Sequence, residues 1–549
     1  MASELRVPAD VPVTHEEQAP ALLTRYRRWW WPAGFVVSGL VLFGIYLRQA
    51  QTVFVMSDGA SNALQGWDML HGNLLLRGWT LTDISFYTTE LPEYMLTEAA
   101  RGLGASAAHV AAALTYTLVV IGAAVLAKGR ADGREGVVRA LVAAGIMLAP
   151  PLGGTSATML NDPDHIGTQV PLLIIWLILD RARPRWPVPV AVAVLLAWGQ
   201  IADPLVTYEG VLPIVVVCAI RVYRRREHLI QNLPESWYEL ALAAGAIVST
   251  GVAAVALRLI RQAGGFSVTP PVTTFSPVVD LFSHLGVTAE SILLVFGADF
   301  SGQQLGPGAA VFLIHLAGVA LAGWAVTRAL RRFGTSDLVV QVLATAMVVL
   351  LAAYTFSGSP DIVGGPHEIA GALPVGAVLA GRLLAGQLIS RRHLAALGAV
   401  LACYCLVLAH NFVQQPGYDA NLQLASWLRT HDLRYGLATY WNASSVTVDS
   451  GGQVQVRPVN RGADGRVEAI QRDTLRSWYD HKLHDATFLV MPPSRHVGCA
   501  AGTPADWMAQ ARAQFGPPTA TYRADGFTIV VWNNENLLSL IAPPAPGVC

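Results

Sequence analysis

Long apolar stretches recur through the first 413 residues, and they constrain the fold more than any other feature of the sequence. A helix needs about 20 mostly apolar residues to cross the roughly 30 Å hydrocarbon core of a bilayer. About eleven stretches meet or approach that length, at residues 34–56, 107–127, 137–159, 166–180, 187–202, 205–222, 237–260, 308–328, 338–357, 369–386 and 394–413. The sequence therefore predicts a polytopic α-helical protein of the plasma membrane.

The composition agrees with this prediction. Hydrophobic residues make up 53% of the chain and charged residues only 13%, whereas soluble proteins carry about 25% charged residues. The 37 basic residues balance 37 acidic ones, so no excess of charge favours a nucleic-acid partner. Lysine occurs only at Lys128 and Lys482, which is compatible with a bacterial, GC-rich source.

Basic residues in the short loops predict the orientation, because cytoplasmic loops are enriched in Arg and Lys. The polar segment before the first span ends in Arg25, Arg27 and Arg28. The ends of the even-numbered spans are basic as well, at residues 128–130, 181–185, 221–226, 328–332 and 391–392. We therefore expect residues 1–32 to be cytoplasmic, 33–413 to form the transmembrane domain, and the rest of the chain to lie outside.

The last part of the chain, residues 414–549, predicts a separate extracytoplasmic α/β domain. Its alternating patterns are typical of strands at 437–441, 445–448, 454–456, 486–490 and 527–532. Helical periodicity appears around 420–428 and 504–515. Cys499 and Cys549 lie in this region, and in an oxidising compartment they could form a disulfide.

The first outside loop, residues 57–105, is too long for a simple connector and begins with acidic Asp58 at the bilayer surface. A helical pattern follows, and the later segment 90–94 carries Glu90 and Glu93 at the start of a second amphipathic stretch. Carboxylates at both ends of one loop could converge. Glu90 and Glu93 could instead stabilise a helix N-terminus, and Asp58 could be an ordinary carboxylate solvated at the interface.

The order of these residues resembles the first loop of protein O-mannosyltransferases and aminoarabinose transferases, which belong to the GT-C superfamily. The matching positions are Asp58, Gly72-Asn73, Trp79, Glu90-Leu-Pro-Glu-Tyr94 and Gly104. The resemblance implies a GT-C-like fold for residues 33–413 and equates Asp58 with the catalytic aspartate of those enzymes. Glu90 and Glu93 would then help to position the acceptor or a metal.

Two positions depart from the family pattern. Leu91 stands where many relatives have a lysine that meets the lipid phosphate, and Gly59 follows Asp58 where an acidic residue is common. The phosphate contact must then come from elsewhere, because a phosphate favours a guanidinium that can bind two oxygens. The candidates outside the membrane are Arg77, Arg101, Arg258, Arg261 and His367, the last in a segment that resembles a late motif of the family.

The second outside loop contains Asp162 and Asp164 in the sequence Asn161-Asp-Pro-Asp-His165. This segment resembles the Asp-x-Asp of the oligosaccharyltransferases in the superfamily, and such oxygen ligands could hold a divalent metal near a phosphate. A polar hairpin between two spans would look the same. The long fourth outside loop, residues 261–307, includes an apolar, helix-like stretch at 277–296 that could cover a lipid groove.

The resemblance implies an inverting glycosyltransferase that moves a sugar from a polyprenyl-phosphate donor to an acceptor hydroxyl at the extracytoplasmic face, with Asp58 as general base. The acceptor could be a cell-envelope glycan, a lipid or a protein. Two alternatives remain open: a transporter or lipid flippase, and a catalytically inactive GT-C-like scaffold. A transporter is expected to show an internal repeat and broken or ionisable spans near the bilayer midplane, and neither is evident in the sequence.

Overall fold

The computed structural model describes residues 21–225, 229–269, 274–300, 308–358, 360–361, 365–462, 464–491, 502–533 and 535–541. Cys499 and Cys549, and with them the proposed disulfide, lie outside these residues, as does the start of the predicted cytoplasmic segment.

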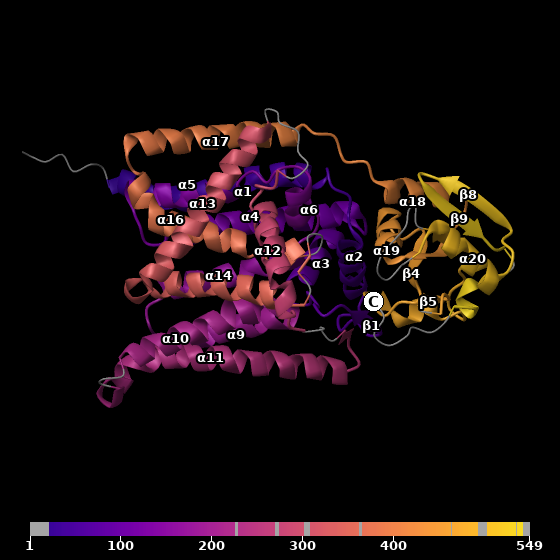
Figure 1. Cartoon of the computed structure of the whole chain (residues 1–549), viewed down its shortest axis with the longest axis horizontal. Helices are drawn as coiled ribbons and strands as arrows, with labels where there is room; N and C mark the ends of the chain where they lie inside the picture. Colours follow the sequence, from indigo (N-terminus) through magenta and orange to yellow (C-terminus); the bar gives the residue numbers. More distant parts are fainter. Residues whose placement is uncertain are drawn as a thin grey trace, which may run out of the picture.

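Seven helices among the described residues are long and apolar enough to cross a membrane. They are Trp31–Ala50 in α1 (Ala21–Ala50), α4 (Ala105–Lys128), Ser236–Gln262 in α11 (Leu229–Gln262), Val278–Val295 around α12 (Leu281–Val295), Ala309–Arg331 in α13 (Gly308–Arg331), α14 (Leu338–Phe356) and α17 (Arg391–Phe412). Two shorter apolar helices, α9 (Pro187–Ala202) and α16 (Ala372–Leu388), lie among them. Because most of these helices run alongside one another (Figure 1), the chain has the architecture of a helical membrane protein.

Each of the eleven predicted stretches contains a helix, but not every stretch is one continuous span. The stretch 137–159 is divided between α5 (Gly133–Met147) and α6 (Gly154–Leu160), because the intervening Pro150 and Pro151 lack the N–H that a helix requires. The fourth and sixth stretches form α8 (Gln169–Arg181) and α10 (Leu212–Arg224), the latter after a π-helical turn, η1 (Thr207–Val211). Helix α12 lies in the predicted outside loop and runs across α14 in Figure 1. The number of spans therefore stays a prediction.

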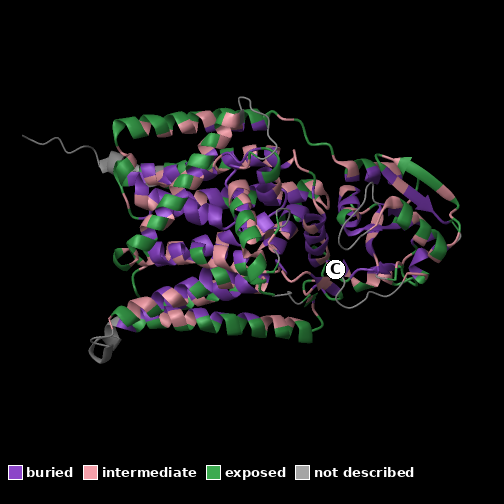
Figure 2. Cartoon of the chain, in the orientation of Figure 1, coloured by how far each residue is buried: buried purple, intermediate pink, exposed green. Residues whose placement is uncertain are grey.

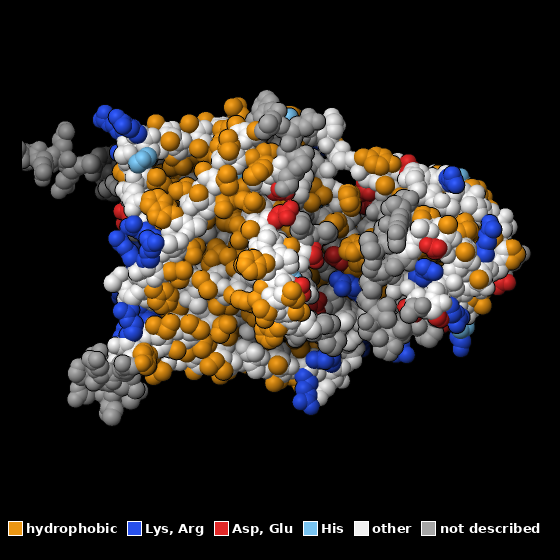
Figure 3. All heavy atoms as spheres, viewed as in Figure 1, with side chains coloured by type: hydrophobic (Ala, Val, Ile, Leu, Met, Phe, Trp, Pro, Cys, Tyr) orange, Lys and Arg blue, Asp and Glu red, His pale blue; other side chains and the backbone are white. Residues whose placement is uncertain are grey.

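Burial follows the positions of the helices in the bundle. Figure 2 shows α4 and α5 with many buried residues and α11 and α17 with much of their surface exposed. The exposed surface of the helical part is largely apolar, as the space-filling view in Figure 3 shows. Such a surface suits contact with lipid rather than with water.

The C-terminal region contains a six-stranded mixed sheet of order β5-β4-β3-β7-β9-β8. The strands are β3 (Tyr435–Thr439), β4 (Gln455–Arg461), β5 (Val467–Ala469), β7 (Phe488–Met491), β8 (Ala520–Ala524) and β9 (Phe527–Val531). Strand β3 is parallel to β4 and β7, and the pairs β4–β5, β7–β9 and β8–β9 are antiparallel, with Leu437 opposite Leu489 and Leu489 opposite Val530.

Helices cover both faces of this sheet. Helix α20 (Pro504–Phe515) buries Trp507 against one face, whereas α18 (Ala420–Thr430) and α19 (Tyr440–Asp449) pack on the other. The helices predicted around 420–428 and 504–515 are confirmed. The strand predicted at 445–448 is wrong, because these residues belong to α19. The α/β character predicted for the C-terminal region is therefore present, with one element of a different type.

A second, smaller sheet connects this region to the membrane part. Its order is β2-β1-β6, with β1 (Trp79–Leu81) from the first loop, β2 (Ser267–Val268) from the loop after α11 and β6 (Thr474–Leu475) from the C-terminal region. Trp79 pairs with Leu475 in the sheet, and its ring meets that of Trp478 edge to face at 5.0 Å between centroids. The C-terminal region is therefore fixed to the first loop by backbone and by aromatic contacts.

Candidate active site

Asp58 lies in the first turn of α2 (Ser57–Leu70), the first helix of the predicted outside loop. Oδ1 of Asp58 accepts a hydrogen bond from Oη of Tyr440 in α19, and the same hydroxyl lies 2.9 Å from Oδ2 of Asp473. A tyrosine hydroxyl carries one proton, so it cannot donate to both carboxylates at once. The two carboxyl groups are therefore linked through one hydroxyl, and their protonation states depend on each other.

Burial raises the pKa of the Asp58 carboxyl, whereas the hydrogen bond from Tyr440 and the charge of Arg472 act in the opposite direction. Burial and the neighbouring Asp58 likewise raise the pKa of Asp473, to about 6. Sequence reasoning missed Tyr440, Arg472 and Asp473. Their only sequence signal is the ionisable pair Arg472-Asp473, which nothing local connects to Asp58.

Asp162 reaches the same site from the segment that follows α6. A Cβ atom added at Gly59 would lie only 2.6 Å from Oδ2 of Asp162. The space beside the backbone of Gly59 is thus occupied by a carboxylate from another loop. The glycine that departs from the family pattern has a structural reason, since a larger residue there would displace Asp162.

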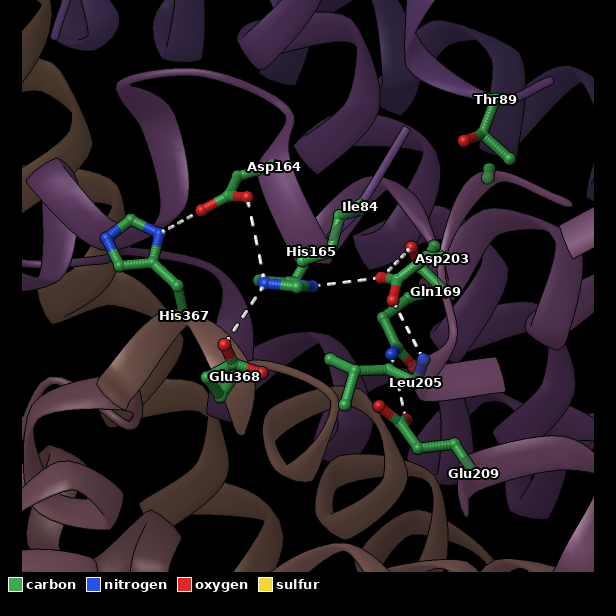
Figure 4. Close-up of polar contacts among 12 residues, drawn as sticks. Ile84, Thr89, Asp164, His165, Gln169, Asp203, Leu205, Glu209, His367 and Glu368 are labelled. Carbon is green, nitrogen blue, oxygen red and sulfur yellow. Dashed lines mark hydrogen bonds and ion pairs between the residues drawn. The ribbon is translucent and has the colours of Figure 1, made fainter. Parts of the chain in front are cut away.

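A chain of polar contacts leads away from Asp164, as Figure 4 shows. Nδ1 of His367, from α15 (Gly365–Glu368), lies 2.7 Å from Oδ2 of Asp164 at the start of α7 (Asp164–Gly167). His165 comes next, with Nε2 at 4.0 Å from Oδ1 of Asp164 and 3.6 Å from Glu368, and Nδ1 at 2.9 Å from Oδ2 of Asp203. This network joins three segments that are far apart in the sequence.

The carboxylates of this network control the charge of the two imidazoles. Burial alone would lower the pKa of His165, but Glu368, Asp203 and Asp164 raise it well above its ordinary value. The hydrogen bond to Asp164 likewise raises the pKa of His367 against the effect of burial. The acidic neighbours therefore favour the protonated form of both rings, and a metal ion bound by His367 would have to displace its proton.

Asp162, Asp164 and His367 could together hold a metal ion, because one ligand atom of each lies within 4.8 Å of the others. Oδ1 of Asp162 is buried and has no hydrogen-bond partner among the described residues. Burial and the nearby Asp164 raise the pKa of Asp162, as expected for two acids that compete for one site. A divalent cation would relieve both the missing contact and the repulsion, so the residues fit such an ion.

Comparison with known proteins identifies the fold. No protein-family model matches the sequence, and no curated protein matches it. The solved structure of ArnT from Cupriavidus metallidurans bound to undecaprenyl phosphate is similar over 94% of this chain and 100% of that chain, with 15% identity and a TM-score of 0.55. The apo structure of the same enzyme covers 94% and 99%, with 13% identity and a TM-score of 0.52. ArnT is a glycosyltransferase of the GT-C superfamily.

This chain has the GT-C fold. The Archaeoglobus fulgidus oligosaccharyltransferase tethered to an acceptor peptide is more distantly similar, with 13% identity, a TM-score of 0.47, and coverage of 85% of this chain and 69% of that chain. The GT-C architecture expected from the first-loop motifs is therefore present, and it brings the loops that carry Asp58, Asp162, Asp164 and His367 to one end of the helical bundle.

Two of the acidic residues predicted in the first loop lie in α3 (Glu90–Arg101), beside the GT-C bundle. Glu90 is 1% exposed, and its Oε1 fills the space where Gly167 would otherwise carry a Cβ. Burial raises the pKa of Glu90 well above its ordinary value, and among the charged neighbours Asp203 raises it most. Oε2 of Glu93 accepts a hydrogen bond of 2.6 Å from Thr115 in α4. Neither residue takes part in the hydrogen bonds that link Asp58, Tyr440 and Asp473.

None of the arginines predicted to bind phosphate is among the charges that chiefly shift the pKa of Asp58. Arg77, Arg101, Arg258 and Arg261 are exposed, and the cations that act most strongly on Asp58 are Arg472 and His367. Leu91, which stands at the lysine position of relatives, is completely buried. Figure 3 shows acidic and basic side chains gathered where the apolar helical part meets the C-terminal region. This junction is the candidate active site.

Proposed function

We propose that this protein is a glycosyltransferase that moves a sugar from a polyprenyl-phosphate donor to an acceptor hydroxyl at the extracytoplasmic face of the membrane. The observation that carries the proposal is the position of Asp58. Its Oδ1 is held by Tyr440, and no hydrogen bond to its Oδ2 occurs among the described residues. Because Oδ2 has no hydrogen-bond partner there, it can accept a proton from a substrate hydroxyl, as a general base must.

In the proposed step, Oδ2 of Asp58 takes the proton of the acceptor hydroxyl as that oxygen attacks the anomeric carbon. The bond between this carbon and the phosphate oxygen breaks, and its electron pair stays with the departing polyprenyl phosphate. Attack opposite to the leaving group inverts the anomeric centre. Burial raises the pKa of Asp58, and a base whose pKa is closer to the working pH is a stronger proton acceptor.

Asp162, Asp164 and His367 would hold a divalent cation beside this base. Such a cation would offset negative charge on the donor phosphate. A divalent cation would supply counter-charge here, because six carboxyl groups lie in or beside the site and His367 would be neutral while it binds the metal. The acids are Asp58, Asp162, Asp164, Asp203, Glu368 and Asp473, and the basic groups are Arg472, His165 and His367.

The proposal includes a topology. Residues 1–32 would be cytoplasmic and residues 414–549 extracytoplasmic, which puts Asp58 on the outer face. The basic side chains at the end of the helical part opposite to the C-terminal region, visible in Figure 3, support this orientation. The ArnT structure with undecaprenyl phosphate supports a polyprenyl-phosphate donor. The acceptor would be a glycan, lipid or protein of the cell envelope.

The test is release of polyprenyl phosphate by the purified full-length protein, given a panel of polyprenyl-phosphate sugars and a cell-envelope extract. Wild type should release it, and Asp58→Asn should not. The matched control is Asp68→Asn, because Asp68 lies on the same helix but bonds Asn73 and Trp79. Release by Asp58→Asn at the wild-type rate would remove Asp58 as the base. No release by any of the three proteins would contradict the transferase.

A further inference from the structure

The C-terminal region contributes three side chains to the immediate surroundings of Asp58. Tyr440 is the first residue of α19, whereas Arg472 and Asp473 directly precede β6. Asp473 has a backbone φ of 49°, a left-handed conformation that few residues other than glycine adopt. Backbone conformations of this kind concentrate at functional sites.

The hydroxyl of Tyr440 is held from several sides. It lies between the carboxyl groups of Asp58 and Asp473 and hydrogen-bonds to them. The Arg472 guanidinium also lies over the Tyr440 ring, 5.7 Å from its centroid. Asp473 is fixed in turn at Oδ1 by Gln65 and by the backbone N–H of Thr82, each at 3.3 Å. The phenol is therefore preorganised, because its partners are themselves held in place.

The whole of α19 is docked on α2 through a row of serine contacts. Ser57 Oγ donates to the carbonyl of Tyr440 at 2.7 Å, and the hydroxyls of Ser61 and Ser444 lie 3.0 Å apart. Ser445 Oγ donates to the carbonyl of Val55 at 3.1 Å. These contacts, together with the β1–β6 pairing, give Tyr440 one position relative to Asp58.

We propose that Tyr440, held by Arg472 and Asp473, is a positioning residue that fixes the Asp58 carboxylate with Oδ2 toward the acceptor hydroxyl. This inference rests on the proposed function. It assigns the C-terminal region a part in the transfer step itself, because the region supplies the hydrogen bond that prevents the carboxylate from rotating. A region that only covered the site or only bound the acceptor would not affect the base.

The rate of transfer as a function of pH separates this role from simple docking. The groups that face Asp58 are Tyr440, Arg472 and Asp473 from the C-terminal region, Asp162 and Asp164 from the second outside loop, and His367 from α15. The Tyr440 hydrogen bond favours the charged carboxylate, so Tyr440→Phe should move the acidic limb of kcat/KM to higher pH, by about one unit. Asp473→Asn removes a like charge and should move the same limb to lower pH.

The experiment measures kcat and KM from pH 5 to 9 for wild type, Tyr440→Phe, Asp473→Asn and Ser444→Ala. We expect Tyr440→Phe to lower kcat about 10- to 100-fold with little change in KM, and the two site variants to shift the limb in opposite directions. Ser444→Ala weakens the same α2–α19 contact away from Asp58, so it should keep the wild-type pH profile. Thermal unfolding of each variant checks that it is folded.

Two results would overturn the inference alone: a wild-type kcat and profile for Tyr440→Phe, or the same loss for Ser444→Ala as for Tyr440→Phe. The second result would show that the loss of activity comes from weakened packing of α19 on α2 and not from loss of the Tyr440 hydroxyl. Absence of transfer by wild type would instead contradict the proposed function, and this inference with it.

Discussion

Substituting Gly59 by alanine is the smallest change that should damage the site, because it adds one methyl group next to the proposed base Asp58 and against Asp162. The new Cβ would lie 2.6 Å from Oδ2 and 2.8 Å from Cβ of Asp162. Comfortable contacts between such atoms begin near about 3.4 Å, so the carboxylate must move by about 0.8 Å. Since Asp162 is a predicted metal ligand, the displacement acts on the proposed cation site directly.

The magnitude follows from two opposing effects. Overpacking a buried position costs about 1–3 kcal/mol, while replacing glycine by alanine in a helix gains about 0.5–1 kcal/mol. Unfolding free energy should therefore fall by no more than about 2.5 kcal/mol. Transfer should fall further, by about 10- to 100-fold, because a misplacement of about 1 Å near reacting groups has that effect.

Gly66→Ala is the matched control. Gly66 lies on the same helix, and a Cβ there would be 2.8 Å from Cβ of Tyr94, so its steric cost is similar. We expect both variants to lower the unfolding temperature. Only Gly59→Ala should strongly reduce the release of polyprenyl phosphate, whereas Gly66→Ala should stay within about threefold of wild type. Equal rates for Gly59→Ala and wild type, or equal losses for both variants, would refute the reasoning.

Two further outcomes are expected. Glu98 is 1% exposed, neither carboxylate oxygen has a partner among the described residues, and burial raises its pKa to about 9. The folded state therefore binds a proton that the unfolded state loses above its ordinary pKa. Stability should fall as pH rises from about 4.5 to 9, and Glu98→Gln should flatten this dependence in thermal unfolding, whereas an unchanged slope would contradict it. Mn²⁺ should raise the unfolding temperature of wild type but not of Asp162→Asn, and an equal rise in both would remove the metal site.

The elements that sequence reasoning predicted well are those with strong local signals. The apolar stretches form helices, because a span must satisfy all its backbone hydrogen bonds internally. Asp58, Asp162, Asp164 and His367 meet at one end of the bundle, and the predicted topology places the loops that carry them on one side of the membrane. Their convergence could be inferred from topology and did not require knowledge of side-chain contacts.

Helix α19 shows where local signals fail. The segment 445–448 alternates as a strand would, yet it is helical. It packs on the sheet through Val446, and on α2 through Ser444 and on the residue Val55 before α2 through Ser445. All of residues 443–448 are buried. A helix enclosed on two sides has no polar face, so the period of 3.6 residues that identifies a surface helix is absent.

The same enclosure explains why the partner of Asp58 could not be found from the sequence. Tyr440 and Asp58 are 382 positions apart, and the register between them depends on how α19 docks on α2. Docking depends in turn on short serine contacts and a β1–β6 pairing of two residues, signals too weak to recognise in a single sequence. If Tyr440 does position the base, then the membrane part has an incomplete active site without the C-terminal region. Chains that share the apolar helices and Asp58 but lack a hydroxyl at this place should then hold the carboxylate by other means.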